Sequence, residues 1–154
     1  MAIIAIFSPK GGVGKSTMAV NLAWCSATLS KKRTLLWELD PQRGASYLLG
    51  EDEEHGKPAF SIFSKDRPAK SIITATEIEG LDLLPSDGSM VGLDSYFNQL
   101  GKKRRLAKIA DDLRSEYEII ILDCPPVMNE VARQIMRAAD LIIVPLSPSP
   151  LARR

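Results

Sequence analysis

The chain has 154 residues, 25% of them charged, and a formal net charge of +1. This length suits one domain with a substantial core, and the balanced charge gives no global signal of nucleic-acid binding. A single histidine and two cysteines argue against a histidine-rich metal centre, a Ser–His–Asp triad and a disulfide framework. We expect Cys25 and Cys124 to be reduced thiols of a cytoplasmic protein. No apolar run approaches the ~20 residues of a membrane span, so no membrane anchor is expected.

The first residues predict a strand followed by a phosphate-binding loop. Ala2 to Phe7 is apolar, and Ser8-Pro9-Lys10-Gly11-Gly12-Val13-Gly14-Lys15-Ser16-Thr17 follows directly. Glycines in such a loop let backbone N–H groups converge on an anion without Cβ clashes. We expect Lys15 to reach the β- and γ-phosphates of a nucleotide, and the Ser16 hydroxyl to bind Mg²⁺. The strict motif has glycine where Pro9 stands, whereas the variant here adds a second lysine, Lys10.

Apolar segments alternate with helical patterns along the rest of the chain. Apolar residues at helical spacing predict helices at 16–30, 106–113 and 131–138. Gly101 interrupts a further helical region that starts at Leu93. Strands are expected at 2–7, 34–39, 81–84, 118–122 and 141–144. Uninterrupted apolar runs are typical of strands that are buried on both faces. The pattern predicts an α/β, three-layer P-loop NTPase fold, with a mainly parallel sheet and helices on both faces. We expect residues 50–70 to form a surface excursion with one short helix.

Asp123 is the first candidate for a metal-binding carboxylate. It follows four apolar residues and should emerge at the carboxyl end of a buried strand, where ligands bind in open α/β sheets. An acidic residue in that place is a Walker B element, which helps to hold Mg²⁺ beside the phosphates. Pro125 and Pro126 remove backbone donors and stiffen the exit of the strand. The alternative is an aspartate that only ends a strand.

The loop resembles the deviant Walker A motif of the ParA/MinD family of partition and positioning ATPases. The resemblance continues through Asp40-Pro41-Gln42, Leu81 to Pro85, Asp123-Cys124-Pro125-Pro126 and Val144-Pro145. It implies one P-loop ATPase domain over residues 1–154 that binds ATP and Mg²⁺, forms a homodimer in the ATP state and hydrolyses ATP slowly. In that family the first lysine, here Lys10, reaches the partner's nucleotide.

The resemblance also assigns roles to residues. Nucleotide binding would involve Lys10, Gly11, Gly12, Val13, Gly14, Lys15, Ser16 and Thr17. Lys10, Lys15 and Asp40 would be catalytic, and the metal would be held by Ser16, Asp40 and Asp123. The switch residues would be Asp40, Pro41, Gln42, Asp123, Cys124, Pro125 and Pro126. An Asp-Pro turn that ends a strand is the alternative for Asp40. Glu38 stands where the family more often has aspartate, and its additional methylene argues against an exact positioning role.

Partition members of this family bind DNA non-specifically and are activated by a ParB-like centromere-binding protein. The candidate DNA-contacting residues here are Lys102, Lys103, Arg104, Arg105 and Lys108. Such contacts would be electrostatic and sensitive to salt. The alternative for this cluster is an ordinary solvated face. The resemblance implies a cytoplasmic, nucleoid-associated protein.

Family members continue beyond the strand expected at 141–144, so the resemblance implies a chain that lacks the C-terminal third, with its last strand unpaired on the outer edge. Either the chain is a fragment or a naturally shortened homologue, which we favour, or this apolar edge is capped by a partner or by a swapped segment. Two other functions stay open: a MinD-like positioning ATPase, and a truncated, non-hydrolysing nucleotide-binding interaction protein.

Overall fold

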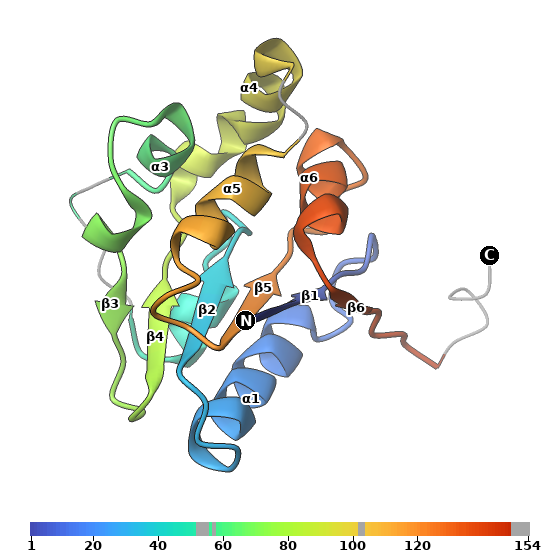
Figure 1. Ribbon diagram of the computed structural model, residues 1–154. Helices are drawn as coiled ribbons and strands as arrows, with labels where there is room; N and C mark the ends of the chain where they lie inside the picture. The colour runs from blue at the N-terminus through green and yellow to red at the C-terminus, as the bar shows by residue number, and fades with distance from the viewer. Residues whose placement is uncertain (52–55, 57, 102–103, 149–154) are drawn as a thin grey trace.

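The computed structural model describes residues 1–51, 56, 58–101 and 104–148, which form a twisted sheet between two layers of helices (Figure 1). The strands are β1 (Ala2–Ile6), β2 (Thr34–Glu38), β3 (Thr74–Ala75), β4 (Leu81–Leu84), β5 (Ile119–Asp123) and β6 (Leu141–Ile143). Their order in the sheet is β3-β4-β2-β5-β1-β6. Every neighbouring pair is parallel except β3 and β4. The predicted α/β fold with a mainly parallel sheet is confirmed.

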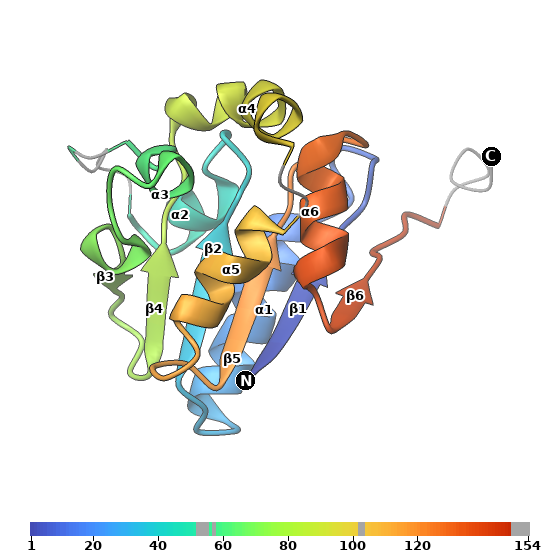
Figure 2. The same cartoon turned by 45° about the horizontal axis from the view of Figure 1, so that its top comes forward.

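Helices cover both faces of the sheet (Figure 2). One face carries α1 (Lys15–Thr28) and α2 (Gly44–Leu48), whose alanines pack against alternate residues of the central strands. The other face carries α3 (Ser61–Ser64), α4 (Leu93–Leu100), α5 (Arg105–Asp112) and α6 (Glu130–Ala138), with the short 3-10 helices η1 (Ala69–Ser71) and η2 (Gly88–Gly92). Because strand residues alternate between the two faces, the sheet divides the core in two. No helix among the described residues has both the length and the apolar character needed to cross a membrane.

The strand register aligns the ends of the three central strands. Asp123, the last residue of β5, lies opposite Ile6 on β1 and opposite Glu38 on β2. All three strands run in the same direction, so the loops that follow them leave from one edge of the sheet. This edge is where open α/β sheets bind ligands.

The segment expected as a surface excursion contributes to the core instead. Phe63 on α3 is fully buried and stacks on Trp37 of β2, with the ring centroids 6.0 Å apart. Phe97 of α4 meets the Phe63 ring edge-on, with the two ring centroids 5.5 Å apart. The short helix expected in this segment is present as α3, but its polar and proline-containing surroundings wrongly predicted a surface position for it. Aromatic pairs of this kind contribute about 0.5–1.5 kcal/mol beyond the area they bury.

The last strand departs from its expected burial. The continuous apolar run predicted a strand covered on both faces, but Leu141 is 53% exposed and Ile142 is 37% exposed. β6 pairs with β1, and no other strand of the described residues pairs with it. Its place at the edge of the sheet leaves it without the packing that β5 receives.

Candidate functional site

The loop after β1 has the backbone of an anion-binding nest. Gly12 and Gly14 adopt left-handed conformations, with φ of 71° and 84°. These angles strain any residue that has a Cβ, which explains the glycines. α1 begins immediately after Gly14 without a side-chain cap, and the carbonyl of Gly14 accepts the N–H of Met18 at 2.9 Å. The first N–H groups of α1 therefore remain available to an anion at the helix N-terminus.

The two lysines of the loop occupy different environments. Lys15 is 7% exposed, and its Nζ donates a hydrogen bond to the carbonyl of Lys10 at 3.4 Å. No carboxylate of the described residues forms an ion pair with Lys15. Lys10 itself is exposed. Lys15 therefore places a buried positive charge under the loop without an ion pair to the described residues, while Lys10 faces outward.

Asp123 supplies a buried carboxylate that has no hydrogen-bond partner. Its side chain is fully buried, and neither carboxylate oxygen accepts a hydrogen bond from the described residues. The pKa of Asp123 is raised to about 6, mainly by burial and also by the nearby charges of Glu38 and Asp40. The Ser16 hydroxyl, which lies close without meeting full hydrogen-bond geometry, and the Lys15 ammonium lower it in part. An unpartnered buried carboxylate beside a hydroxyl fits a bound cation.

The donor set suits Mg²⁺ bound together with phosphates. The described residues contain no group of three or more His, Cys, Asp or Glu side chains placed to hold a metal. Mg²⁺ typically binds through one or two carboxylates and completes its shell with water and phosphate oxygens. Asp123 and Ser16 therefore fit such an ion, provided that the remaining ligands come from the nucleotide and from water.

Asp40 begins the turn that leaves β2. Its Oδ1 accepts the N–H of Gln42 at 3.0 Å, and its carbonyl accepts the N–H of Arg43 at 3.1 Å. These bonds belong to the strand-terminal turn, which was one of the two interpretations of this residue. Its Oδ2 accepts no hydrogen bond from the described residues. Asp40 is half-buried at the same edge as Asp123, and its role toward a metal or water stays a prediction.

Glu38 is an exactly positioned residue, contrary to the expectation from its additional methylene. Its Oε1 accepts the N–H groups of Ala45 at 2.8 Å and Ser46 at 3.2 Å. Its Oε2 accepts the Ser46 hydroxyl at 2.5 Å and the N–H of Ser86 at 3.2 Å. The fully buried carboxylate thus satisfies the first N–H groups of α2 and joins them to the loop after β4. The longer side chain gives it the reach for these contacts.

Gly44 is a site residue that sequence reasoning missed. A Cβ added there would lie 2.8 Å from the Ser16 Oγ and 3.2 Å from the Ser16 Cβ. The first residue of α2 therefore packs directly on the serine that the motif assigns to the metal. The only signal in the sequence was a glycine soon after Asp40-Pro41-Gln42. Its φ is not in the left-handed region, so the close contact with Ser16 is the reason for a glycine here.

The segment after β5 is partly buried. Cys124 is fully buried, and its Sγ donates a hydrogen bond to the carbonyl of Leu122 at 3.4 Å. Pro125 is buried and Pro126 is exposed. A cavity of about 200 Å³ separates this segment from the turn after β2; residues that line it include Leu39, Pro41, Met90, Pro125, Val127 and Val131. The two proposed switch segments therefore border one apolar hollow.

The basic cluster divides in the structure. Lys102 and Lys103 lie outside the described residues. Arg104 and Lys108 are exposed and lie one helical turn apart at the start of α5. Arg105 is buried, and its guanidinium donates hydrogen bonds to the carbonyls of Phe63 and Ile62. The expectation of an exposed DNA-contacting residue is therefore wrong for Arg105, which points into the protein.

Known proteins resemble this chain over nearly its whole length. Residues 1–154 match the family model of an AAA domain. The chromosome partitioning protein ParA of Myxococcus xanthus is 35% identical over 146 residues, and Soj of Bacillus subtilis, a sporulation initiation inhibitor protein, is 34% identical over 146 residues. Each alignment covers 94% of this chain, which spans 51% of the length of ParA and 57% of that of Soj.

Solved structures show the same fold. A cobyrinic acid a,c-diamide synthase from Mycobacterium smegmatis, with a bound ATP analogue and magnesium, superposes with a TM-score of 0.90 at 28% identity. That match covers 100% of this chain and 63% of the other. MinD from Pyrococcus horikoshii, solved with Mg-ADP, superposes with a TM-score of 0.79 at 24% identity. That match covers 98% of this chain and 60% of MinD. The chain belongs to the AAA domain family, and over most of its length it is similar to ParA and Soj.

Proposed function

We propose that this chain is the nucleotide-binding part of a ParA-type partition ATPase that binds Mg-ATP and hydrolyses it slowly. The observation that carries the proposal is the presence of two buried charged groups at one strand edge that form no ion pair with the described residues. Lys15 lies under the left-handed glycine loop, and the Asp123 carboxylate lies beside Ser16 without a hydrogen-bond partner. A nucleotide triphosphate with its cation offers each of these groups the opposite charge.

Each residue has a distinct role in this proposal. Lys15 and the first N–H groups of α1 hold the β- and γ-phosphates, and Ser16 and Asp123 hold Mg²⁺, which neutralises charge that develops on the phosphates. Asp40 has a free carboxylate oxygen at the same edge and orients the attacking water. The similarity to ParA of Myxococcus xanthus, which is named a chromosome partitioning protein, supports this assignment over the positioning type.

The ATP state is proposed to be a homodimer held by Lys10. Its side chain is exposed at the mouth of the loop, while its carbonyl holds Lys15 in place. An exposed cation beside the phosphates can reach a second nucleotide without disturbing its own site. A ParB-like partner that carries an arginine would then accelerate hydrolysis by adding positive charge at the same phosphates.

Calorimetric titration with Mg-ATP tests the proposal, with Mg-GTP and the variant Lys15→Ala as comparisons. We expect micromolar binding that falls at least 100-fold in Lys15→Ala. Lys10→Ala is the matched control, because it removes an exposed lysine of the same loop and should keep monomer binding while losing ATP-dependent dimerisation. Equal affinity in the Lys15 variant would overturn the nucleotide site. An ATP-dependent dimer of Lys10→Ala would overturn the cross-subunit role alone.

Non-specific DNA binding by the ATP dimer is proposed through Arg104 and Lys108. The double variant Arg104→Ala/Lys108→Ala should lower the magnitude of the slope of log affinity against log salt by about 2 for each subunit that contacts DNA. Arg133→Ala is the control, since its guanidinium already pairs with Glu130 at 3.3 Å. An unchanged slope would assign Arg104 and Lys108 to an ordinary solvated face.

A further inference from the structure

The buried guanidinium of Arg105 is bound by neutral groups of the described residues and by no carboxylate among them. Arg105 is 8% exposed, and its Nε donates to the Phe63 carbonyl at 3.0 Å and its Nη2 to the Ile62 carbonyl at 2.8 Å. Both acceptors are neutral, and no carboxylate of the described residues forms an ion pair with it. Arginine stays protonated at any pH at which proteins fold. Within the described part of the chain, the fold therefore buries a positive charge without an ion-pair partner, which is costly.

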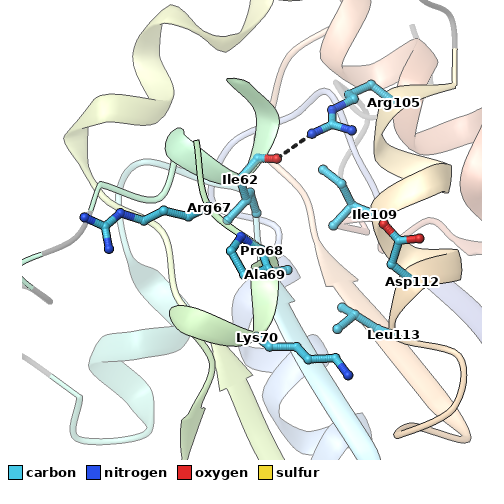
Figure 3. Close-up of a pocket in the computed structure, with 9 residues that line it drawn as sticks. All are labelled: Ile62, Arg67, Pro68, Ala69, Lys70, Arg105, Ile109, Asp112 and Leu113. Atoms are coloured by element: carbon cyan, nitrogen blue, oxygen red, sulfur yellow. Dashed lines mark hydrogen bonds between the residues drawn. The ribbon is translucent and has the colours of Figure 1, made fainter. Parts of the chain in front are cut away.

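Arg105 also lines a cavity of about 100 Å³ between η1 and α5 (Figure 3). Ile62, Pro68 and Ala69 form one wall, and Ile109 and Leu113 form the other. The other charged residues of the lining are Arg67, Lys70 and Asp112. Lys70 pairs with Glu116, whereas Arg67 and Asp112 form no ion pair with the described residues. The cavity thus joins apolar walls to an excess of positive charge.

The unused donors of Arg105 have the geometry for a carboxylate. A guanidinium carries five N–H donors in a plane, and the hydrogen bonds to Phe63 and Ile62 use the edge between Nε and Nη2. The edge between Nη1 and Nη2 remains, and its two parallel N–H groups match the two oxygens of a carboxylate. The volume admits a molecule of about six non-hydrogen atoms.

We propose that this cavity binds a small carboxylate with a short alkyl chain. The carboxylate pairs with the free edge of Arg105, and the alkyl chain packs on Ile109 and Leu113. The cavity lies on the face of the sheet that carries α3 to α6, whereas α1, which follows the phosphate loop, lies on the other. The proposal is therefore independent of the nucleotide site and holds whether or not the chain hydrolyses ATP.

A nuclear magnetic resonance titration of the chain with sodium butyrate at constant ionic strength tests this. We expect saturable shifts of the amide signals of Ile62, Ala69, Ile109 and Leu113, with a dissociation constant of about 5 mM. Butyramide, which has the same shape and no charge, should cause no saturable shift. Linear shifts with butyrate, or equal saturation by butyramide, would overturn the carboxylate site.

Two exposed aspartates give a matched pair of variants. Asp112→Asn removes the negative charge that lines the cavity and should tighten butyrate binding about threefold. Asp111→Asn makes the same change in total charge, but Asp111 pairs with Arg114 at 2.8 Å and does not line the cavity, so affinity should not change. Arg105→Lys keeps the positive charge but removes the two parallel N–H groups of the guanidinium, so it should weaken butyrate binding at least tenfold. Equal tightening in both aspartate variants would show a non-local charge effect and overturn the site.

Discussion

Two buried carboxylates face each other across neighbouring strand ends, and they differ in almost every other respect. Glu38 and Asp123 are register partners on β2 and β5, and both are fully buried. Glu38 accepts four hydrogen bonds, whereas Asp123 accepts none from the described residues. One carboxylate is committed to the fold, and the other is left available for a ligand. Hydrogen-bond satisfaction separates a structural acid from a functional one where burial does not.

The largest expected effect comes from removing the committed carboxylate. Glu38→Ala leaves three backbone N–H groups and the Ser46 hydroxyl without their acceptor. We expect the free energy of unfolding to fall by about 4 kcal/mol or more, measured by urea unfolding. Glu38→Gln keeps the length and one oxygen and should lose less. A loss below about 1 kcal/mol in Glu38→Ala would remove the contrast with Asp123.

The available carboxylate should show the opposite behaviour. Because the pKa of Asp123 is raised to about 6, the folded protein binds more protons than the unfolded chain between about pH 4 and pH 6. The contribution of Asp123 to the free energy of unfolding therefore falls as pH rises through that window, by about 3 kcal/mol at most. Without Mg²⁺ and nucleotide, Asp123→Asn should be more stable than the parent at pH 7 and nearly equal at pH 4. A stability difference that is flat with pH would contradict the assignment.

Gly44 lies between the two sites, because it packs on Ser16 and the next two residues donate to Glu38. Its substitution should change stability less than the loss of Glu38. Gly44→Ala brings a Cβ within 3.2 Å of the Ser16 Cβ, so α2 or the serine must shift. We expect a loss of about 1–2 kcal/mol and about tenfold weaker Mg-ATP binding. Gly92→Ala is the control, because nothing lies within 4 Å of its added Cβ. Unchanged binding in Gly44→Ala would separate α2 from the metal site.

The smallest effect concerns the hydroxyl groups of two serines whose backbone N–H groups both donate to the Glu38 carboxylate. Ser46→Ala removes a hydrogen bond to Glu38 and should cost about 1 kcal/mol in thermal or urea unfolding. Ser86→Ala removes a buried hydroxyl that has no partner among the described residues and keeps the N–H that Glu38 accepts, so stability should not fall. Equal losses in the two variants would mean that the hydroxyl bond to Glu38 adds nothing.

Local patterns predicted the features that local chemistry controls. The glycine loop, the strands at 34–38 and 81–84 and the end of α4 at Gly101 follow from spacing, apolar runs and the left-handed conformation of glycine. The partners of Glu38 did not follow, since Ser86 lies 48 residues away and only the sheet brings the two together. The inward turn of Arg105 toward Phe63 has the same origin, a contact across 42 residues. Such contacts join residues that are far apart in the sequence, so neighbouring residues give no sign of them.

The burial of Cys124 gives the protein a chemical reporter of its own motion. Burial, together with the neighbouring Asp123 charge, raises the pKa of this thiol far above its ordinary range. Since only the thiolate attacks alkylating reagents, Cys124 stays inert while the strand exit is closed. Half-buried Cys25 on α1 provides an internal reference for labelling. The rate at which Cys124 is alkylated therefore measures how often the segment after β5 opens, with and without nucleotide.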